Sequence, residues 1–170
     1  LNQRRSNGTL VSAGTGSGKT LAFYLPAMAR IGALRIKQGR GAGWTKLLAI
    51  YPRTELLRDQ FSEIYGEARR LDDLMNKNGA TKIRIGALFG ETPLSAAEFR
   101  YKWNAGTSKG EKWRRTTNGM VCGYMSCPQH NCEGDLIWLH EDIATEKERL
   151  NCAECGSQIE EGELVLTRKS

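Results

Sequence analysis

The sequence predicts an α/β protein with a parallel sheet, to which a small cysteine-rich module has been added. Three observations lead to this fold class. Apolar runs typical of buried strands alternate with helix-like segments over residues 9–89. A glycine-rich loop separates the first of these runs from the first predicted helix. All five cysteines lie between residues 122 and 155, where the alternating pattern has ended.

The predicted elements follow one another as strand, helix, strand, helix and strand. In chain order they are a strand over 9–12, a helix over 19–36 kinked at Pro26, a strand over 46–51, a helix over 54–75 capped by Thr54, and a strand over 82–89. The run at 46–51 is continuously apolar, as expected for a strand buried on both faces. Right-handed crossovers then place the glycine-rich loop at the carboxyl end of a parallel strand.

Composition limits the possible classes. With 39% hydrophobic and 26% charged residues, the chain of 170 residues has the balance of a globular domain, with room for one small extra module. No apolar run is long enough to cross a membrane, and the first residues lack the apolar core of a secretory signal. We therefore expect a cytoplasmic protein without a membrane partner. Because there is no initiator Met, we also expect the chain to belong to a longer protein.

Charge is distributed unevenly along the chain. Residues 133–163 hold ten acidic side chains against Lys147 and Arg149, a net charge of about −8. Since the total is +6, the remainder carries about +14. A basic body suits a polyanion such as nucleic acid, although a solvated surface would have the same composition.

The glycine-rich loop has the residue types of a nucleotide-binding phosphate loop. Gly16 and Gly18 allow backbone N–H groups to face the β- and γ-phosphates. Lys19 is expected to reach the terminal phosphates, and Thr20 to offer its hydroxyl to Mg²⁺, so these two residues are the catalytic candidates. The predicted contacts with Mg²⁺ and ATP come from Ala13, Gly14, Thr15, Gly16, Ser17, Gly18, Lys19 and Thr20.

Two further segments, read together with this loop, resemble superfamily 2 helicases of the DEAD/DEAH type. The first is Pro52-Arg53-Thr54-Glu55-Leu56 with Gln60, which resembles the P-T-R-E-L motif with Arg and Thr exchanged. The second is "GETP" at residues 90–93, which resembles a Gly-Asp-Thr-Pro element of DNA-helicase branches. The resemblance covers residues 9–93. It implies a RecA-like sheet and an ATP-dependent enzyme that hydrolyses nucleoside triphosphate.

The resemblance also implies that the segment after the second strand holds the sugar-phosphate backbone of nucleic acid. A helix start presents free N–H groups and Arg53 adds a charged donor, so the residue types suit this role. The predicted nucleic-acid residues are Pro52, Arg53, Thr54, Glu55 and Gln60. Alternatively, Arg53 and Glu55 form a surface ion pair. From the "GETP" element we expect DNA rather than RNA.

A basic and aromatic stretch follows over residues 99–115. Its cations could contact phosphates, and its rings could stack on bases, as in proteins that bind single strands. Trp103 and Trp113 could equally pack this stretch onto the rest of the protein. We favour packing for the tryptophans and leave both roles open for the cations.

The cysteines form two pairs, and each pair is followed closely by glycine. Cys127 and Cys132 precede Gly134, while Cys152 and Cys155 precede Gly156. Such turns let N–H groups point at thiolate sulfurs, and they are typical of a structural zinc ribbon. We predict Zn²⁺ bound by Cys127, Cys132, Cys152 and Cys155. His130 or Cys122 could replace one ligand, and an iron–sulfur cluster is the second possibility. The acidic ribbon suits contact with another protein.

The sequence leads to one interpretation and two alternatives. We expect residues 1–117 to be a partial RecA-like ATP-binding domain, 118–165 a zinc-ribbon insertion, and 166–170 the return toward the sheet. The chain would then be the first part of an ATP-dependent helicase or translocase. Because the chain contains no Asp-Glu dipeptide, we expect it to hydrolyse ATP poorly by itself. The alternatives are a phosphate-loop ATPase acting on protein or small molecules, and a non-catalytic nucleotide- and zinc-binding module.

Overall fold

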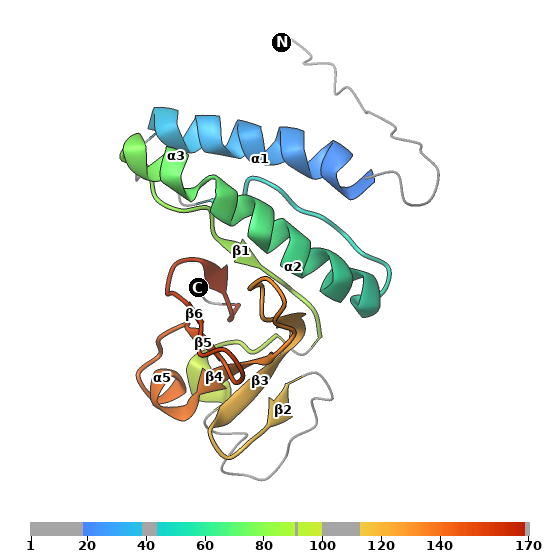
Figure 1. Cartoon of the computed structure of the whole chain (residues 1–170), viewed down its shortest axis with the longest axis vertical. Coiled ribbons are helices and arrows are strands. Elements are labelled where there is room, and N and C mark those ends of the chain that lie inside the picture. Colours follow the sequence, from blue (N-terminus) through green and yellow to red (C-terminus); the bar gives the residue numbers. More distant parts are fainter. Residues whose placement is uncertain (1–18, 39–43, 91, 100–112, 169–170) are drawn as a thin grey trace, which may run out of the picture.

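A computed structural model of the chain describes residues 19–38, 44–90, 92–99 and 113–168. Three helices lie at one end, and an antiparallel sheet lies at the other (Figure 1). The predicted α/β class is confirmed, because the structure combines helices with a parallel and an antiparallel sheet. None of the helices in the described ranges is both long and apolar enough to span a membrane.

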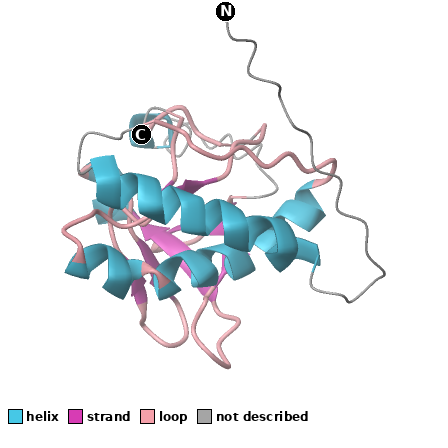
Figure 2. Cartoon of the chain, turned by 90° about the horizontal axis from the view of Figure 1, so that it is seen from above, coloured by secondary structure: helices cyan, strands magenta, loops and turns pink. Residues whose placement is uncertain are grey.

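The helical layer consists of α1 (Lys19–Gln38), α2 (Thr54–Arg70) and α3 (Asp72–Lys77). Helix α1 contacts α2, and α2 in turn contacts the strands (Figure 2). The helix predicted over 54–75 is therefore divided, because the chain leaves α2 at Leu71 and starts α3 one residue later. Gly79 ends this region with φ +66°, a left-handed conformation that favours glycine.

Two sheets complete the fold. Strands β1 (Ile85–Gly86) and β7 (Leu164–Val165) form a two-stranded parallel sheet. The antiparallel sheet has the order β2-β3-β4-β5-β6. Its strands are β2 (Arg114–Arg115), β3 (Gly119–Ser126), β4 (Asp135–Leu139), β5 (Leu150–Cys152) and β6 (Gln158–Ile159), and the short helix α5 (His140–Ala144) follows β4. We call strands β2 to β6, with the turns between them, the cysteine module.

Two hydrophobic cores hold these layers together, and α2 contributes to both. One core joins α2 to α1 and α3, through residues that include Tyr24, Met28, Ile64, Ala68 and Met75. The larger core joins α2 to the cysteine module, through residues that include Phe61, Tyr65, Tyr124, Trp138 and Leu150. The cysteine module therefore shares a continuous core with α2.

Two strand predictions need correction. Residues 46–51 form no paired strand, and Leu48 and Ile50 are 76% and 84% exposed, because no other described strand lies beside them. The strand expected over 82–89 pairs only at Ile85 and Gly86. Its partner is β7, which the sequence pattern had assigned to the cysteine ribbon. The predicted strand at 9–12 lies outside the described residues.

Candidate functional site

The predicted nucleotide site lies at the start of α1. Residues 13–18 of the phosphate loop are outside the described part of the chain. Lys19 and Thr20 are the first two residues of α1, so the loop leads directly into a helix N-terminus. A helix start carries unpaired N–H groups and partial positive charge, which favour a bound phosphate. The order of motif and helix is that expected for nucleotide binding.

The predicted nucleic-acid segment lies at the start of α2. Arg53 occupies the N-cap position with extended backbone (φ −138°, ψ 146°), and Thr54 is the first helical residue. We expected Thr54 to cap this helix, but the N-cap position lies one residue earlier, at Arg53. Pro52, Arg53 and Glu55 are exposed. No ion pair between Arg53 and Glu55 is found in the part of the chain that the structure describes. Both side chains therefore face solvent at a helix N-terminus.

Two described residues of the "GETP" element, Thr92 and Pro93, make hydrogen bonds with neighbouring segments. Thr92 is buried, and its hydroxyl accepts a hydrogen bond from Phe89 N–H (3.0 Å) and donates one to the Ala87 carbonyl (2.9 Å). Arg168 N–H donates to the carbonyl of Pro93 at 2.9 Å. Glu91 is outside the described residues. The Thr92 side chain thus links the backbone at Ala87 and Phe89.

The basic and aromatic stretch is described only at its ends. Phe99 and Trp113 are buried, and their rings meet edge-on with centroids 5.0 Å apart. Packing is therefore confirmed for Trp113, whereas Trp103 lies outside the described residues. Arg114 forms an ion pair with Asp135 on β4. The contact of these cations with nucleic-acid phosphates stays a prediction.

The cysteine module brings the four predicted metal ligands together. The sulfurs of Cys127, Cys132, Cys152 and Cys155 all lie within 4.8 Å of one another. Cys127 and Cys155 are 3.6 Å apart at their sulfurs, as are Cys132 and Cys152. Four thiolates around one zinc ion, with Zn–S bonds of about 2.3 Å, are separated by about 3.8 Å. The observed spacing therefore fits a single tetrahedral ion.

The other possible ligands are not part of this group. Cys122 is 3% exposed and belongs to the large core, and burial raises the pKa of its thiol to about 12. His130 is exposed, and it is not among the ligand atoms that converge in the described residues. A four-iron cluster would hold its thiolates farther apart, because each would bind a different iron. The geometry favours the four cysteines and a mononuclear site.

The two cysteine turns have matching backbone geometry. In each pair, both sulfurs face the N–H of the residue two positions later, and these N–H groups belong to Gln129, Gly134, Glu154 and Ser157. A Cβ at Gly134 would lie 2.8 Å from Cys152 Sγ, so this position requires glycine. Gly156 has φ +69°, and Asn131 has φ 60°. These features are those of paired metal knuckles.

The pKa values of Cys155 and Cys132 differ widely. The hydroxyl and N–H of Ser157 lower the pKa of Cys155 to about 6. The N–H of Gly134 lowers the pKa of Cys132, but burial and the neighbouring thiols outweigh this effect and raise it to about 12. Neighbouring thiolates repel one another, so a divalent cation is needed to keep all four deprotonated. Ser157 was missed at the sequence level, although its position two residues after Cys155 could have indicated it.

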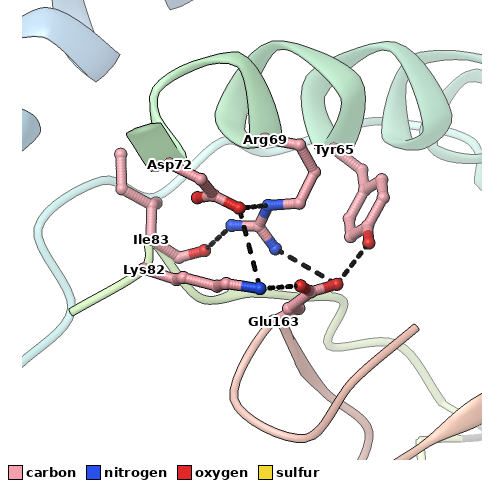
Figure 3. Close-up of polar contacts among 6 residues, drawn as sticks. All are labelled: Tyr65, Arg69, Asp72, Lys82, Ile83 and Glu163. Atoms are coloured by element: carbon pink, nitrogen blue, oxygen red, sulfur yellow. Dashed lines mark hydrogen bonds and ion pairs between the residues drawn. The ribbon is translucent and has the colours of Figure 1, made fainter. Parts of the chain in front are cut away.

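Glu163 is a second residue that the sequence did not reveal. We define the Glu163 network as Tyr65, Arg69, Asp72, Lys82 and Glu163 (Figure 3). Glu163 lies after the second cysteine turn, accepts a hydrogen bond from Tyr65 and forms an ion pair with Lys82. Burial raises the pKa of Glu163, but the donors Lys82 and Tyr65 outweigh it and hold the pKa below its usual range. The network joins α2, the segment before β1 and the segment before β7.

Comparison with known proteins places the chain in a family. The family model of the DEAD/DEAH box helicases matches residues 3–98, more than half of the chain. The chain therefore belongs to the DEAD/DEAH box helicase family, as the three sequence motifs had indicated. No solved structure gives a significant match.

Curated relatives give a more specific similarity. The ATP-dependent RNA helicase HAS1 of Chaetomium globosum is 36% identical over 89 residues, which are 52% of this chain and 13% of that protein. The proteins named ATP-dependent RNA helicase has1 from Emericella nidulans and Aspergillus niger are each 44% identical over 62 residues, covering 36% of this chain and 9% of the relative. The chain thus spans a small part of the relatives' length.

These relatives correct one prediction. The "GETP" element led us to expect DNA as the preferred nucleic acid, but the matching relatives are named RNA helicases. The element differs from its DNA-helicase counterpart at Glu91, which replaces Asp. A short motif with one substitution was too weak a basis for distinguishing the two nucleic acids.

Proposed function

We propose that this chain is the ATP-binding part of an ATP-dependent RNA helicase, in which a zinc-bound cysteine module supports the helicase domain. The observation that carries the proposal is the phosphate loop directly before α1, within the residues that match the family. The names of the matching relatives support RNA as the partner. They also favour this function over an ATPase acting on protein or small molecules and over a non-catalytic module.

The proposed roles follow the position of each residue. Residues 13–18 would surround the phosphates with N–H groups, Lys19 would neutralise the terminal phosphates, and Thr20 would bind Mg²⁺. Pro52–Gln60 would hold the RNA backbone through the start of α2 without reading its sequence. Since the chain contains no Asp-Glu dipeptide, hydrolysis would need an acidic pair from elsewhere in a longer protein. A reducing cytoplasm would keep the cysteines available for metal.

Zinc would have a structural role in this proposal. Cys127, Cys132, Cys152 and Cys155 would occupy all four tetrahedral positions, which leaves none for substrate. The spacing of their sulfurs and the N–H groups that face them support this assignment. The boundaries predicted for the insertion, residues 118–165, stay a proposal.

Equilibrium binding of a fluorescent ATP analogue with Mg²⁺ tests the nucleotide role. Lys19→Ala should weaken binding at least about tenfold, because the charge on the terminal phosphates is lost. Lys37→Ala is the matched control, since Lys37 is exposed in the last turn of the same helix. Equal affinity of both variants and the unaltered protein would contradict the proposed nucleotide site.

A further inference from the structure

Helix α2 is held by different neighbours along its length. The apolar residues of its first half, Leu57 and Phe61, pack in the core shared with the cysteine module. In its second half, Ile64 and Ala68 pack in the core shared with α1 and α3, while Tyr65 still packs in the core shared with the cysteine module. The first half of α2, which continues the segment that starts at Pro52, therefore has its core contacts with the cysteine module in the described structure.

Phe61 and Tyr65 make the closest link. Phe61 is 2% exposed, and its ring meets the ring of Tyr124 on β3 edge-on, with centroids 5.0 Å apart. One helical turn later, the Tyr65 hydroxyl donates a 2.6 Å hydrogen bond to Glu163 Oε2. These side chains are spaced i and i+4, so one face of α2 meets both β3 and the segment that follows the second cysteine turn.

The cysteine site lies at the ends of the strands that form this support. Strand β3 ends at Ser126, immediately before Cys127, and Cys152 is the last residue of β5. Strands β5 and β6 have three and two residues, so few backbone hydrogen bonds hold the second cysteine turn in place. Fixing Cys127 to Cys155 and Cys132 to Cys152 would therefore hold the two ends of the module together.

From this arrangement we infer that the four-cysteine site is a metal-dependent support for the first half of α2. Metal at the site fixes the end of β3, which places Tyr124 against Phe61 and keeps the first turns of α2 in position. The inference concerns α2 itself. Only its consequence, that RNA affinity follows the metal, rests on the proposed function.

Hydrogen exchange of the full chain, without RNA or nucleotide, tests this inference. Removing zinc with a chelator should speed exchange at the amides of residues 57–62 by about tenfold or more. Amides 66–70, on the half of α2 that packs against α1 and α3, should change by less than about threefold. Adding zinc back should restore the original pattern.

Two variants keep the test independent of chelator side effects. Cys155→Ser removes one ligand and should show the metal-free pattern with no further response to chelator. Cys122→Ala keeps all four ligands and should respond to chelator as the unaltered protein does. Unchanged exchange at residues 57–62, while the cysteine module itself loses protection, would overturn the inference. An equal loss in both halves of α2 would also overturn it.

Single-stranded RNA separates this inference from the proposed function. If both are right, metal removal lowers RNA affinity as residues 57–62 lose protection. If the zinc-loaded protein fails to bind RNA, the proposed function is wrong, whereas the exchange pattern still decides whether metal supports α2.

Discussion

Tyr65 on α2 donates a 2.6 Å hydrogen bond to Glu163, which lies 98 residues later in the chain. Glu163 lies beyond the last metal-ligand candidate, and its own backbone carbonyl accepts a hydrogen bond from Ile85 at the start of β1. Glu163 thus connects α2 with both strands of the parallel sheet, β1 and β7. The segment that follows the cysteine module is joined to α2 and to β1 at this point.

Replacing Tyr65 by Phe tests the energetic weight of that contact. The change removes one hydrogen bond to a buried carboxylate and should lower the free energy of unfolding by about 1.5–3 kcal/mol. Chemical denaturation of the zinc-loaded protein measures it. Tyr51→Phe is a useful comparison, because Tyr51 is only partly buried and its hydroxyl contacts Tyr24 rather than a carboxylate. A loss no larger than that of Tyr51→Phe would contradict the role given to Glu163.

The lowered pKa of Glu163 predicts that the free energy of unfolding depends on pH. Because its pKa in the folded protein lies below its usual value, Glu163 contributes stability that is present above the unfolded pKa of about 4.3 and is lost as pH falls through the folded value. Glu163→Gln lacks this titration. The difference in unfolding free energy between the two proteins should therefore shrink as pH falls below about 4.3. A constant difference between pH 7 and pH 3 would exclude the charged contact.

Phe61 should be a main anchor of α2. Phe61→Ala leaves a cavity in the core shared with the cysteine module and should cost about 3–5 kcal/mol of unfolding free energy. Phe23→Ala is the matched control, because Phe23 is 47% exposed and its loss should change stability by no more than about 0.5 kcal/mol. Thermal or denaturant unfolding compares them, and similar costs for both variants would show that α2 does not depend on this contact.

Cysteine alkylation at pH 8 distinguishes the ligand candidates from Cys122. The thiolate is the reactive form, and burial raises the pKa of Cys122 to about 12, so Cys122 should stay unmodified in the folded protein. The other four cysteines should react only after metal removal, and all five after unfolding. Mass spectrometry after treatment with iodoacetamide counts the modified cysteines. Protection of Cys122 only when zinc is bound would mean that it is a ligand.

The two cysteine turns approach closely at Gly134, so a larger residue there should weaken zinc binding. In Gly134→Ala the new methyl would lie 2.8 Å from Cys152 Sγ and 3.0 Å from Glu154 Cβ, so zinc affinity should fall about tenfold or more. Gly66→Ala in α2 is the control, since the added methyl would have no atom within 4 Å beyond its own stretch of helix. It should keep zinc affinity and raise stability by about 0.5–1 kcal/mol. Competition with a chromophoric chelator measures both, and equal affinities would reject the knuckle geometry.

The sequence was most informative where the chemistry is local. The phosphate loop, the Pro52–Gln60 segment and the two cysteine pairs are short motifs, and residues within a few positions of one another define them. The structure brings together the four cysteines that the spacing had selected. The choice of RNA or DNA could not be made in this way, because the two differ at the sugar 2′-hydroxyl, and a short motif does not show whether a residue contacts that group.

Non-local pairing was the part that the sequence could not predict. The apolar run at 46–51 was read as a strand, but a strand needs a neighbour, and pattern alone does not supply one. Leu164 and Val165 follow the second cysteine pair in the chain, yet they pair with Ile85 and Gly86. The contact of Tyr65 with Glu163 joins segments 98 residues apart, so no local pattern could indicate it.

The most direct test of the account is the binding of single-stranded RNA to the zinc-loaded chain, measured by fluorescence anisotropy at several salt concentrations. Arg53→Ala should weaken binding about threefold to tenfold and reduce the salt slope by about 0.7, the value for one phosphate contact on a single strand. Arg70→Ala, an exposed arginine at the other end of α2 that pairs with Glu67, should bind as the unaltered protein does. Equal binding by the Arg53 and Arg70 variants, with an unchanged salt slope, would contradict the claim that the start of α2 holds RNA.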